Sequence, residues 1–180
     1  KPLTLTIALP ALMVVGTHHP AASAETGTDG TKPTKLHAPA ELAPKAGVQT
    51  LDSAPFNAVL KKHLRRGRMD FAGLHADTSA AAQLKLYVAA IARMPETEPL
   101  SSWINAYNAL VIDAVLDRYP LQSVKDAVGG DFKFFSEIQY TVAGQKRSLD
   151  DIENGIIRPR FEDARIHVAI NCGALSCPPL

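Results

Sequence analysis

Residues 103–118 read WINAYNALVIDAVLDR, and this stretch decides the fold class. Its apolar side chains recur every three or four positions and cover two neighbouring faces, a spacing that predicts an α-helix buried over much of its circumference. We expect Ser101 or Ser102 to cap the start of this helix. Pro120 lacks the backbone N–H that a further turn needs, so the helix is predicted to end near Arg118.

Two amide side chains lie inside the apolar stripe of this helix, at Asn105 and Asn108. An amide buried without a partner costs about 1–3 kcal/mol, so each must be hydrogen-bonded to a specific group. Two interpretations stand. Either the amides fix the backbone of loops, or one of them orients a catalytic group.

Two further helices are predicted on the N-terminal side. Asp52 or Ser53 is expected to cap the first, with Pro55 in its first turn and apolar residues at positions 56, 59, 60 and 64. The second covers residues 79–93, where apolar side chains again share one side.

The pattern becomes mixed on the C-terminal side. Residues 138–142 alternate as a strand, a turn follows and residues 145–147 return, which predicts a hairpin. Ser148 is expected to cap a short helix that Pro159 ends, and residues 166–170 (IHVAI) predict another strand. Helices followed by a small, mostly antiparallel sheet give an α+β fold class, with the N-terminal helices packed on the sheet.

Acidic residues gather where the helix after Ser148 begins, at Asp150, Asp151 and Glu153. The dipole of a helix favours acids in its first turn, so we interpret them as helix-start residues and predict no metal site. Two cysteines without a second ligand pair do not make a zinc site either. No phosphate-binding or nucleotide-binding motif is present, and no cofactor is predicted.

The N-terminal part of the sequence resembles an export signal. An apolar run at residues 3–16 is too short to span a bilayer, and Ala22-Ser23-Ala24 has the pattern that signal peptidase cleaves. We therefore expect a secretory signal over residues 1–24, a flexible linker over residues 25–50, and one α+β domain over residues 51–180. The mature protein is then periplasmic or extracellular, without a transmembrane segment.

Composition limits the partners of this domain. The 180 residues include 46% hydrophobic and 21% charged residues, with a net charge of +1, which is typical of one folded domain. Such a balanced charge excludes a strong electrostatic site for nucleic acid. A small molecule or a peptide is the expected ligand, and the sequence leaves the oligomeric state open.

The last ten residues carry the most reactive side chains, at Cys172 and Cys177. The four residues between them allow a local disulfide, which an exported protein would favour. Alternatively, Cys172 is a reactive thiol, which needs a neighbouring base or cation. His167 is the nearest histidine, but on a regular strand residues 167 and 172 point to opposite faces, so His63 and His75 are further candidates.

Three ordered blocks resemble the domain of unknown function 547 family. They are residues 102–110 (SWINAYNAL), residues 148–153 with 157–161 (SLDDIE and IRPRF), and His167 with residues 171–180 (NCGALSCPPL). The resemblance implies a fold and assigns no activity. Members of the family continue past the last block, so it also implies that a C-terminal portion is missing here.

The blocks concentrate polar and aromatic residues where a packing domain would show aliphatic ones. They add Trp103, Tyr107, Arg158 and Arg160 as candidate substrate-binding residues. The two arginines either clamp a carboxylate or pair with Asp150 and Asp151.

Two functions follow from these residues. The first is a cysteine-dependent hydrolase or acyl transferase, in which Cys172 attacks an acyl group, His167 is the base, and Asn105 or Asn108 orients the imidazole or polarises the carbonyl. The second is a non-catalytic envelope-binding module that a Cys172–Cys177 disulfide stiffens. A dithiol redox site is a third, lesser interpretation.

Overall fold

The computed structural model describes residues 50–130, 132–173, 177 and 180, and these residues pack around one hydrophobic core. The expected secretory signal and almost all of the expected linker lie outside them. The fold class is α+β, as predicted from the sequence. The strands form two separate antiparallel hairpins, β1–β2 and β3–β4, each of two strands.

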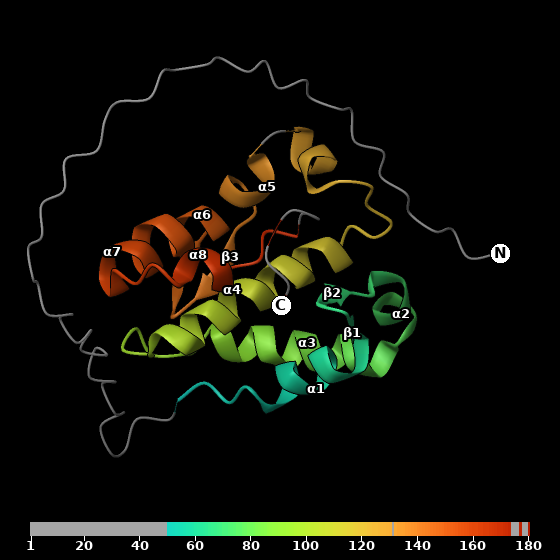
Figure 1. The fold of residues 1–180 in the computed structure, drawn as a ribbon, viewed down its shortest axis with the longest axis horizontal. Coiled ribbons are helices and arrows are strands. Elements are labelled where there is room, and N and C mark those ends of the chain that lie inside the picture. The colour runs from blue at the N-terminus through green and yellow to red at the C-terminus, as the bar shows by residue number, and fades with distance from the viewer. Residues whose placement is uncertain (1–49, 131, 174–176, 178–179) are drawn as a thin grey trace, which may run out of the picture. The chain divides into compact units, whose positions relative to one another are not determined.

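Helix α4 (Leu100–Leu116) is the centre of this core (Figure 1). It packs against α3 (Thr78–Ile91) on one side and against α6 (Leu149–Ile152) and the following π turn on another. Burial from several directions explains the wide apolar stripe, since 13 of the 17 residues of α4 are buried. The helix begins three residues before Trp103, and its N-cap is Pro99 rather than Ser101 or Ser102. The Pro99 carbonyl accepts from the backbone N–H of Ser102 at 3.0 Å.

Helix α1 (Ala54–His63) forms where it was predicted, with Pro55 in its first turn. Asp52 accepts from the Ala54 N–H at 2.9 Å, whereas the Ser53 side chain makes no capping bond. The helix packs on α3 through Phe56, whose ring stacks on Tyr87 with 5.2 Å between the ring centres.

Between α1 and α3 lies a segment that the sequence pattern did not predict. Strands β1 (Leu64–Arg65) and β2 (Arg68–Met69) form a hairpin, with positive φ at both residues of its turn, Arg66 and Gly67. Helix α2 (Phe71–Ala76) follows, and then α3, each capped by the aspartate immediately before it.

After α4 come a 3₁₀ segment, η1 (Val124–Gly129), and α5 (Lys133–Ser136). The predicted hairpin is confirmed as β3 (Tyr140–Val142) and β4 (Gln145–Arg147). The predicted capping box is also confirmed at α6, where Ser148 Oγ accepts from the Asp151 N–H at 3.1 Å and Asp151 Oδ2 accepts from the Ser148 N–H at 2.8 Å.

The prediction that Pro159 ends this helix is wrong. A π turn, η2 (Glu153–Ile157), continues α6 into α7 (Arg158–Phe161). Pro159 lies in the first turn of α7, immediately after the π turn. The chain leaves the helix at Glu162, which has a left-handed backbone with φ of 48°.

The strand predicted at residues 166–170 is also wrong, because these residues form the short helix α8 (Ile166–Ala169) and its C-cap. Ile166 and Ile170 are buried, whereas His167 and Val168 are exposed. A separation of four residues between buried positions fits a helical turn, so burial decides the conformation of this run.

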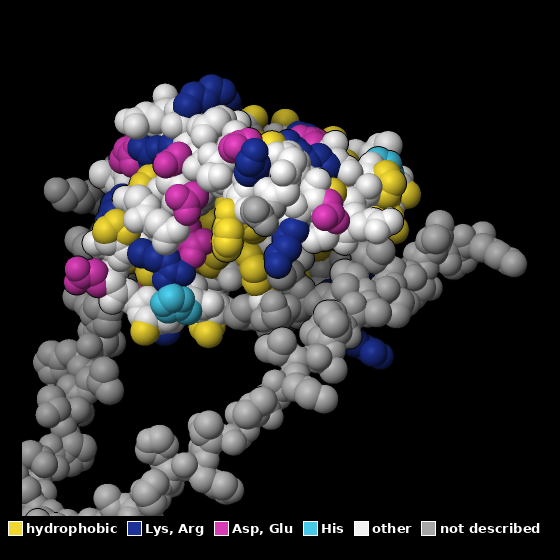
Figure 2. All heavy atoms as spheres, turned by 90° about the horizontal axis from the view of Figure 1, so that it is seen from above, with side chains coloured by type: hydrophobic (Ala, Val, Ile, Leu, Met, Phe, Trp, Pro, Cys, Tyr) yellow, Lys and Arg dark blue, Asp and Glu magenta, His cyan; other side chains and the backbone are white. Residues whose placement is uncertain are grey.

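Surface charge is mixed. On the face that Figure 2 shows, acidic and basic side chains are interspersed, in keeping with the near-neutral composition. In the part of the chain that the structure describes, none of the helices has the length and apolar character needed to cross a bilayer.

Candidate functional site

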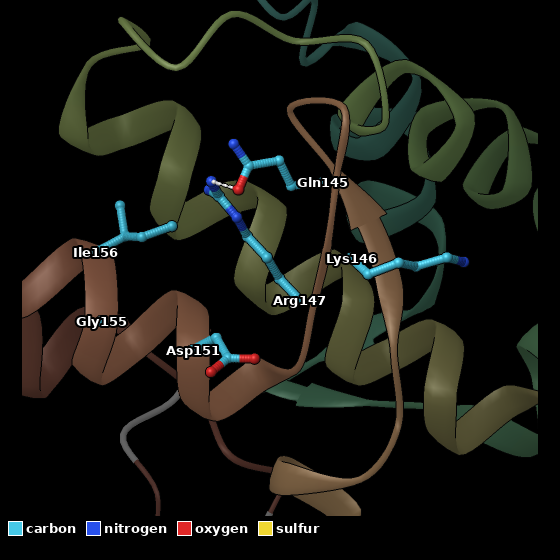
Figure 3. Close-up of a pocket in the computed structure, with 6 residues that line it drawn as sticks. All are labelled: Gln145, Lys146, Arg147, Asp151, Gly155 and Ile156. Carbon is cyan, nitrogen blue, oxygen red and sulfur yellow. Dashed lines mark hydrogen bonds between the residues drawn. The ribbon is translucent and has the colours of Figure 1, made fainter.

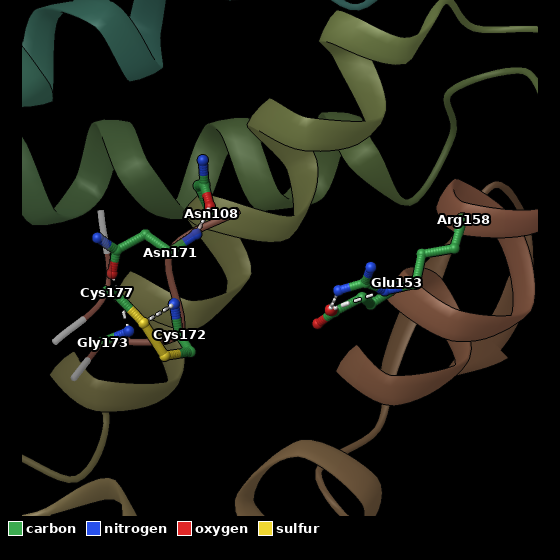
Figure 4. Close-up of a disulfide and its surroundings, with 7 residues drawn as sticks. All are labelled: Asn108, Glu153, Arg158, Asn171, Cys172, Gly173 and Cys177. Atoms are coloured by element: carbon green, nitrogen blue, oxygen red, sulfur yellow. Dashed lines mark hydrogen bonds and ion pairs between the residues drawn. A yellow bond between two sulfur atoms is a disulfide. The ribbon is translucent and has the colours of Figure 1, made fainter. Parts of the chain in front are cut away.

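The two cysteines are bonded to each other. Cys172 and Cys177 form a disulfide with 6.2 Å between their Cα atoms (Figure 4). This confirms the bridged alternative of the sequence analysis. Neither sulfur is therefore a free thiol in this structure.

Asn108 holds the chain just before the disulfide. Its side-chain Nδ2 donates to the Ala169 carbonyl at 3.0 Å, and its Oδ1 accepts from the Asn171 N–H at 2.9 Å (Figure 4). The amide is only 5% exposed, so both bonds form away from bulk water. This is the first of the two roles predicted for a buried amide in α4.

The backbone turns sharply immediately after Cys172. Asn171 Oδ1 accepts from the Gly173 N–H at 2.8 Å, and Gly173 has a φ of 78°, which favours glycine. A Cβ at Gly173 would contact Val111 of α4 and Val124 of η1, each at 3.6 Å. We call residues 169–173 together with Cys177 the disulfide segment.

Asn105 has a different partner. Its Nδ2 donates to Ser53 Oγ at 3.3 Å, which joins α4 to the start of α1. The two asparagines proposed as alternative orienting groups for Cys172 therefore bind separate parts of the chain.

A second polar cluster lies across η2, α7 and α8. Arg158 donates from Nε and Nη2 to Glu153 Oε1, at 3.2 and 2.5 Å (Figure 4). Its Nη1 lies 3.1 Å from Nδ1 and 3.0 Å from Nε2 of His167. Two of the predicted site residues, Arg158 and His167, are thus brought together.

Tyr107 connects this cluster to α4. Burial raises the pKa of its hydroxyl well above the ordinary value, and the charge of Glu153 raises this pKa further. We call Tyr107, Glu153, Arg158 and His167 the polar relay. It runs from a fully buried hydroxyl to an exposed imidazole.

The relay reaches the surface at a shallow hollow of about 300 Å³. Its lining residues are Arg158, Glu162, Asp163, Ala164, Ile166 and His167. Two of the charges there are already balanced, since Arg158 pairs with Glu153 and Asp163 pairs with Arg165 at 2.6 Å. Arg165 accordingly lowers the pKa of Asp163 to about 2.

The other two predicted binding residues, Trp103 and Arg160, make contacts within the fold. Trp103 is completely buried, with the guanidinium of Arg147 5.7 Å from the centre of its ring. Arg160 donates to the Glu96 carbonyl and lies over the ring of Phe161. The predicted pairing of the arginines with Asp150 and Asp151 is wrong, because the π turn directs Arg158 to Glu153 instead.

The two alternative histidines have other partners. His63 is buried, and its Nε2 lies 2.9 Å from Asp77 Oδ2. The ring of His75 packs on Tyr119, with 4.9 Å between the ring centres.

A second hollow of about 310 Å³ lies between β4 and the π turn (Figure 3). Arg147 crosses it and donates to Gln145 Oε1 at 3.1 Å. The same guanidinium forms an ion pair with Glu96.

Glu153 belongs to the polar relay, but the sequence pattern did not identify it as a site residue. It was interpreted as a helix-start acid, and its separation of five residues from Arg158 does not bring two side chains together on an α-helix. The π turn supplies the missing alignment, and such turns are frequent at functional sites.

Comparison with known proteins gives one match. No curated protein and no solved structure matches the chain. Residues 91–180 match the family described as "Protein of unknown function, DUF547". This region contains the disulfide segment and the whole polar relay, and it covers half of the sequence. The chain belongs to the DUF547 family.

Proposed function

We propose that this chain is an exported, non-catalytic binding module that holds a peptide in the hollow beside Arg158 and His167. The observation that carries the proposal is the Cys172–Cys177 disulfide, which leaves no thiolate for nucleophilic catalysis while the bridge is intact. The apolar run at residues 3–16 and the small residues 22–24 support export, and an oxidising compartment favours the bridge.

The hollow has the mixed chemistry that a peptide needs. Arg158 and His167 offer hydrogen-bond donors, Glu162 offers acceptors, and Ala164 and Ile166 offer apolar surface. Because the charges of Arg158 and Asp163 are balanced by neighbours, the hollow favours a polar backbone over a strongly charged ligand.

The disulfide segment supports this site through α8. One end of α8 carries His167, which contacts Arg158, and the other end carries the Ala169 carbonyl that Asn108 binds. A short helix fixed at both ends presents its side chains with little loss of entropy on binding.

A displayed library of random peptides, selected on the oxidised full chain, tests this proposal. Enriched peptides should bind at least tenfold more weakly, by calorimetry, to Arg158→Gln. The matched control Arg65→Gln should bind them normally, since Arg65 is an exposed arginine of the β1–β2 hairpin whose side chain donates to its neighbour Leu64. Failure to enrich any peptide, or equal binding to both variants, would overturn it.

The hydrolase hypothesis stays a prediction for the reduced chain alone. It needs Cys172 as a thiolate with His167 as its base, and Asn105 and Asn108 are hydrogen-bonded to Ser53 and to backbone instead. Peptide mapping of the exported protein distinguishes the two functions. A Cys172–Cys177 cross-linked peptide is expected for the binding module, and a free Cys172 that alkylates rapidly near pH 6 for the enzyme.

A further inference from the structure

Neither cysteine of the disulfide belongs to the buried core. Cys172 and Cys177 are each partly exposed, unlike the core residues that surround α4. Approach of an external thiolate to the bridge is the first requirement for thiol–disulfide exchange, and partial exposure of both residues favours it.

The environment of the two sulfur atoms is unequal. The backbone N–H of Cys172 donates to Cys177 Sγ, with 3.3 Å between nitrogen and sulfur. A donor aimed at a sulfur stabilises the negative charge of its thiolate. Cys177 is consequently the better leaving group when an external thiolate attacks the bridge.

The fold around the bridge is held by other bonds. Asn108 fixes the backbone at residues 169 and 171, and a Cβ at Gly173 would contact Val111 and Val124. On the far side of Cys177, the Leu180 N–H donates to the Gly67 carbonyl at 3.3 Å. The hydrogen bonds do not involve the sulfur–sulfur bond, so we expect the reduced chain to keep its structure.

We propose that Cys172 and Cys177 form a reversible dithiol–disulfide site that exchanges with a dithiol partner. A thiolate of the partner attacks Cys172 Sγ, forms a mixed disulfide and releases Cys177 as a thiolate beside the Cys172 N–H. The second thiol of the partner then loses its proton and attacks the partner's own sulfur in the mixed disulfide, releasing Cys172. This chain gains two electrons and two protons, and the partner loses them as it becomes a disulfide.

Thiol exchange and peptide binding use different side chains. Its residues lie outside the hollow that Arg158 and His167 line, so loss of peptide binding and loss of redox exchange are separate results. The Arg158→Gln variant should therefore titrate with a dithiol as the natural sequence does.

Redox titration of the full chain with dithiothreitol tests the proposal, with the two states separated by alkylation and intact mass. We expect complete reduction and reoxidation with an unchanged circular dichroism spectrum. With glutathione at limiting concentration, the trapped mixed disulfide should lie on Cys172. Reduction that occurs only with loss of the folded circular dichroism spectrum overturns the proposal. So does a bridge that dithiothreitol reduces only when denaturant is added.

Two single-cysteine variants test whether Cys177 is the better leaving group. In Cys172→Ser the backbone N–H of position 172 still faces the Cys177 thiol, whereas Cys177→Ser leaves the Cys172 thiol without that donor. The pH at which alkylation reaches half its maximal rate should be at least one unit lower for Cys172→Ser. Equal or reversed values would overturn the assignment of Cys177 as leaving group.

Discussion

Glu153 and Arg158 lie five residues apart and form an ion pair, with 2.5 Å between Glu153 Oε1 and Arg158 Nη2. They can pair because the backbone from Glu153 to Ile157 is a π turn. On a regular α-helix, residues five apart point about 140° away from each other. The π turn brings them together, as the bond from the Arg158 N–H to the Glu153 carbonyl shows. One local change in helix type thus completes the polar relay.

Removal of the Asn108 amide should weaken the attachment of the disulfide segment. Asn108→Ala deletes two buried hydrogen bonds and leaves the Ala169 carbonyl and the Asn171 N–H without this partner. We expect the free energy of unfolding to fall by about 2–3 kcal/mol, measured by urea denaturation. The exposed Asn154→Ala, which loses only a bond to Asp150, should cost less than about 0.5 kcal/mol. Equal losses for the two variants would contradict the role of Asn108 in holding the disulfide segment.

Stability should fall above pH 10 in a way that depends on Tyr107. Burial, followed by the charge of Glu153, raises the pKa of this hydroxyl in the folded chain. Because the hydroxyl loses its proton first in the unfolded chain, near pH 10, the contribution of Tyr107 to the free energy of unfolding is constant below that pH and decreases as pH rises further. Urea midpoints at pH 8 and pH 11 measure the decrease, which should be smaller in Tyr107→Phe. Tyr119→Phe is the control, because Tyr119 is more exposed than Tyr107. If it reduced the loss of stability between pH 8 and pH 11 as much as Tyr107→Phe does, Tyr107 would not be the group responsible.

The capping box predicts acid sensitivity. The backbone N–H of Ser148 and then its hydroxyl lower the pKa of Asp151, so the folded chain binds fewer protons than the unfolded chain. The stabilisation is present above about pH 4 and is lost as pH falls below it. Asp151→Ala should lower the free energy of unfolding by about 1 kcal/mol at pH 7. Between pH 4 and pH 2 this free energy should fall less in the variant than in the natural sequence.

The matched control for Asp151 is Glu137→Ala. Glu137 is an exposed acid that pairs with Lys133 four residues earlier, and its loss should cost less than about 0.5 kcal/mol. If the acid limb of the stability curve were the same in Asp151→Ala as in the natural sequence, the carboxylate would not be the group that titrates.

Loss of both cysteines should destabilise the chain without unfolding it. A cross-link between residues five apart closes a short loop, so its entropic contribution is only about 2 kcal/mol. The double variant Cys172→Ser with Cys177→Ser should lower the free energy of unfolding by that amount and keep a cooperative transition. A chain that fails to fold would show that the bridge holds the segment, and that the Asn108 bonds do not suffice.

The parts of the fold that local sequence signals specify were predictable. The three-to-four spacing of α4, the turn of the β3–β4 hairpin and the capping box at Ser148 each arise from residues close in sequence. The run at residues 166–170 was not predictable, because five mostly apolar residues satisfy both periods and only tertiary burial chooses between them.

The candidate site was predictable in its residue types and less so in its arrangement. Buried amides need partners, which pointed to Asn108, but its partners lie more than 60 residues away and leave no local pattern. The sequence left the state of Cys172 open between bridge and thiol. Glu153 was missed because the π turn that aligns it has no periodicity signal.

Asn108 also sets an order in which the chain assembles. The two backbone groups that it binds follow it by 61 and 63 residues, whereas the turns of α4 close over four. Contacts of such high sequence separation carry a larger closure entropy and form after local ones. We therefore expect the bonds from Asn108 to Ala169 and Asn171 to form after the turns of α4, so that the last stretch of chain docks onto a helix that already exists.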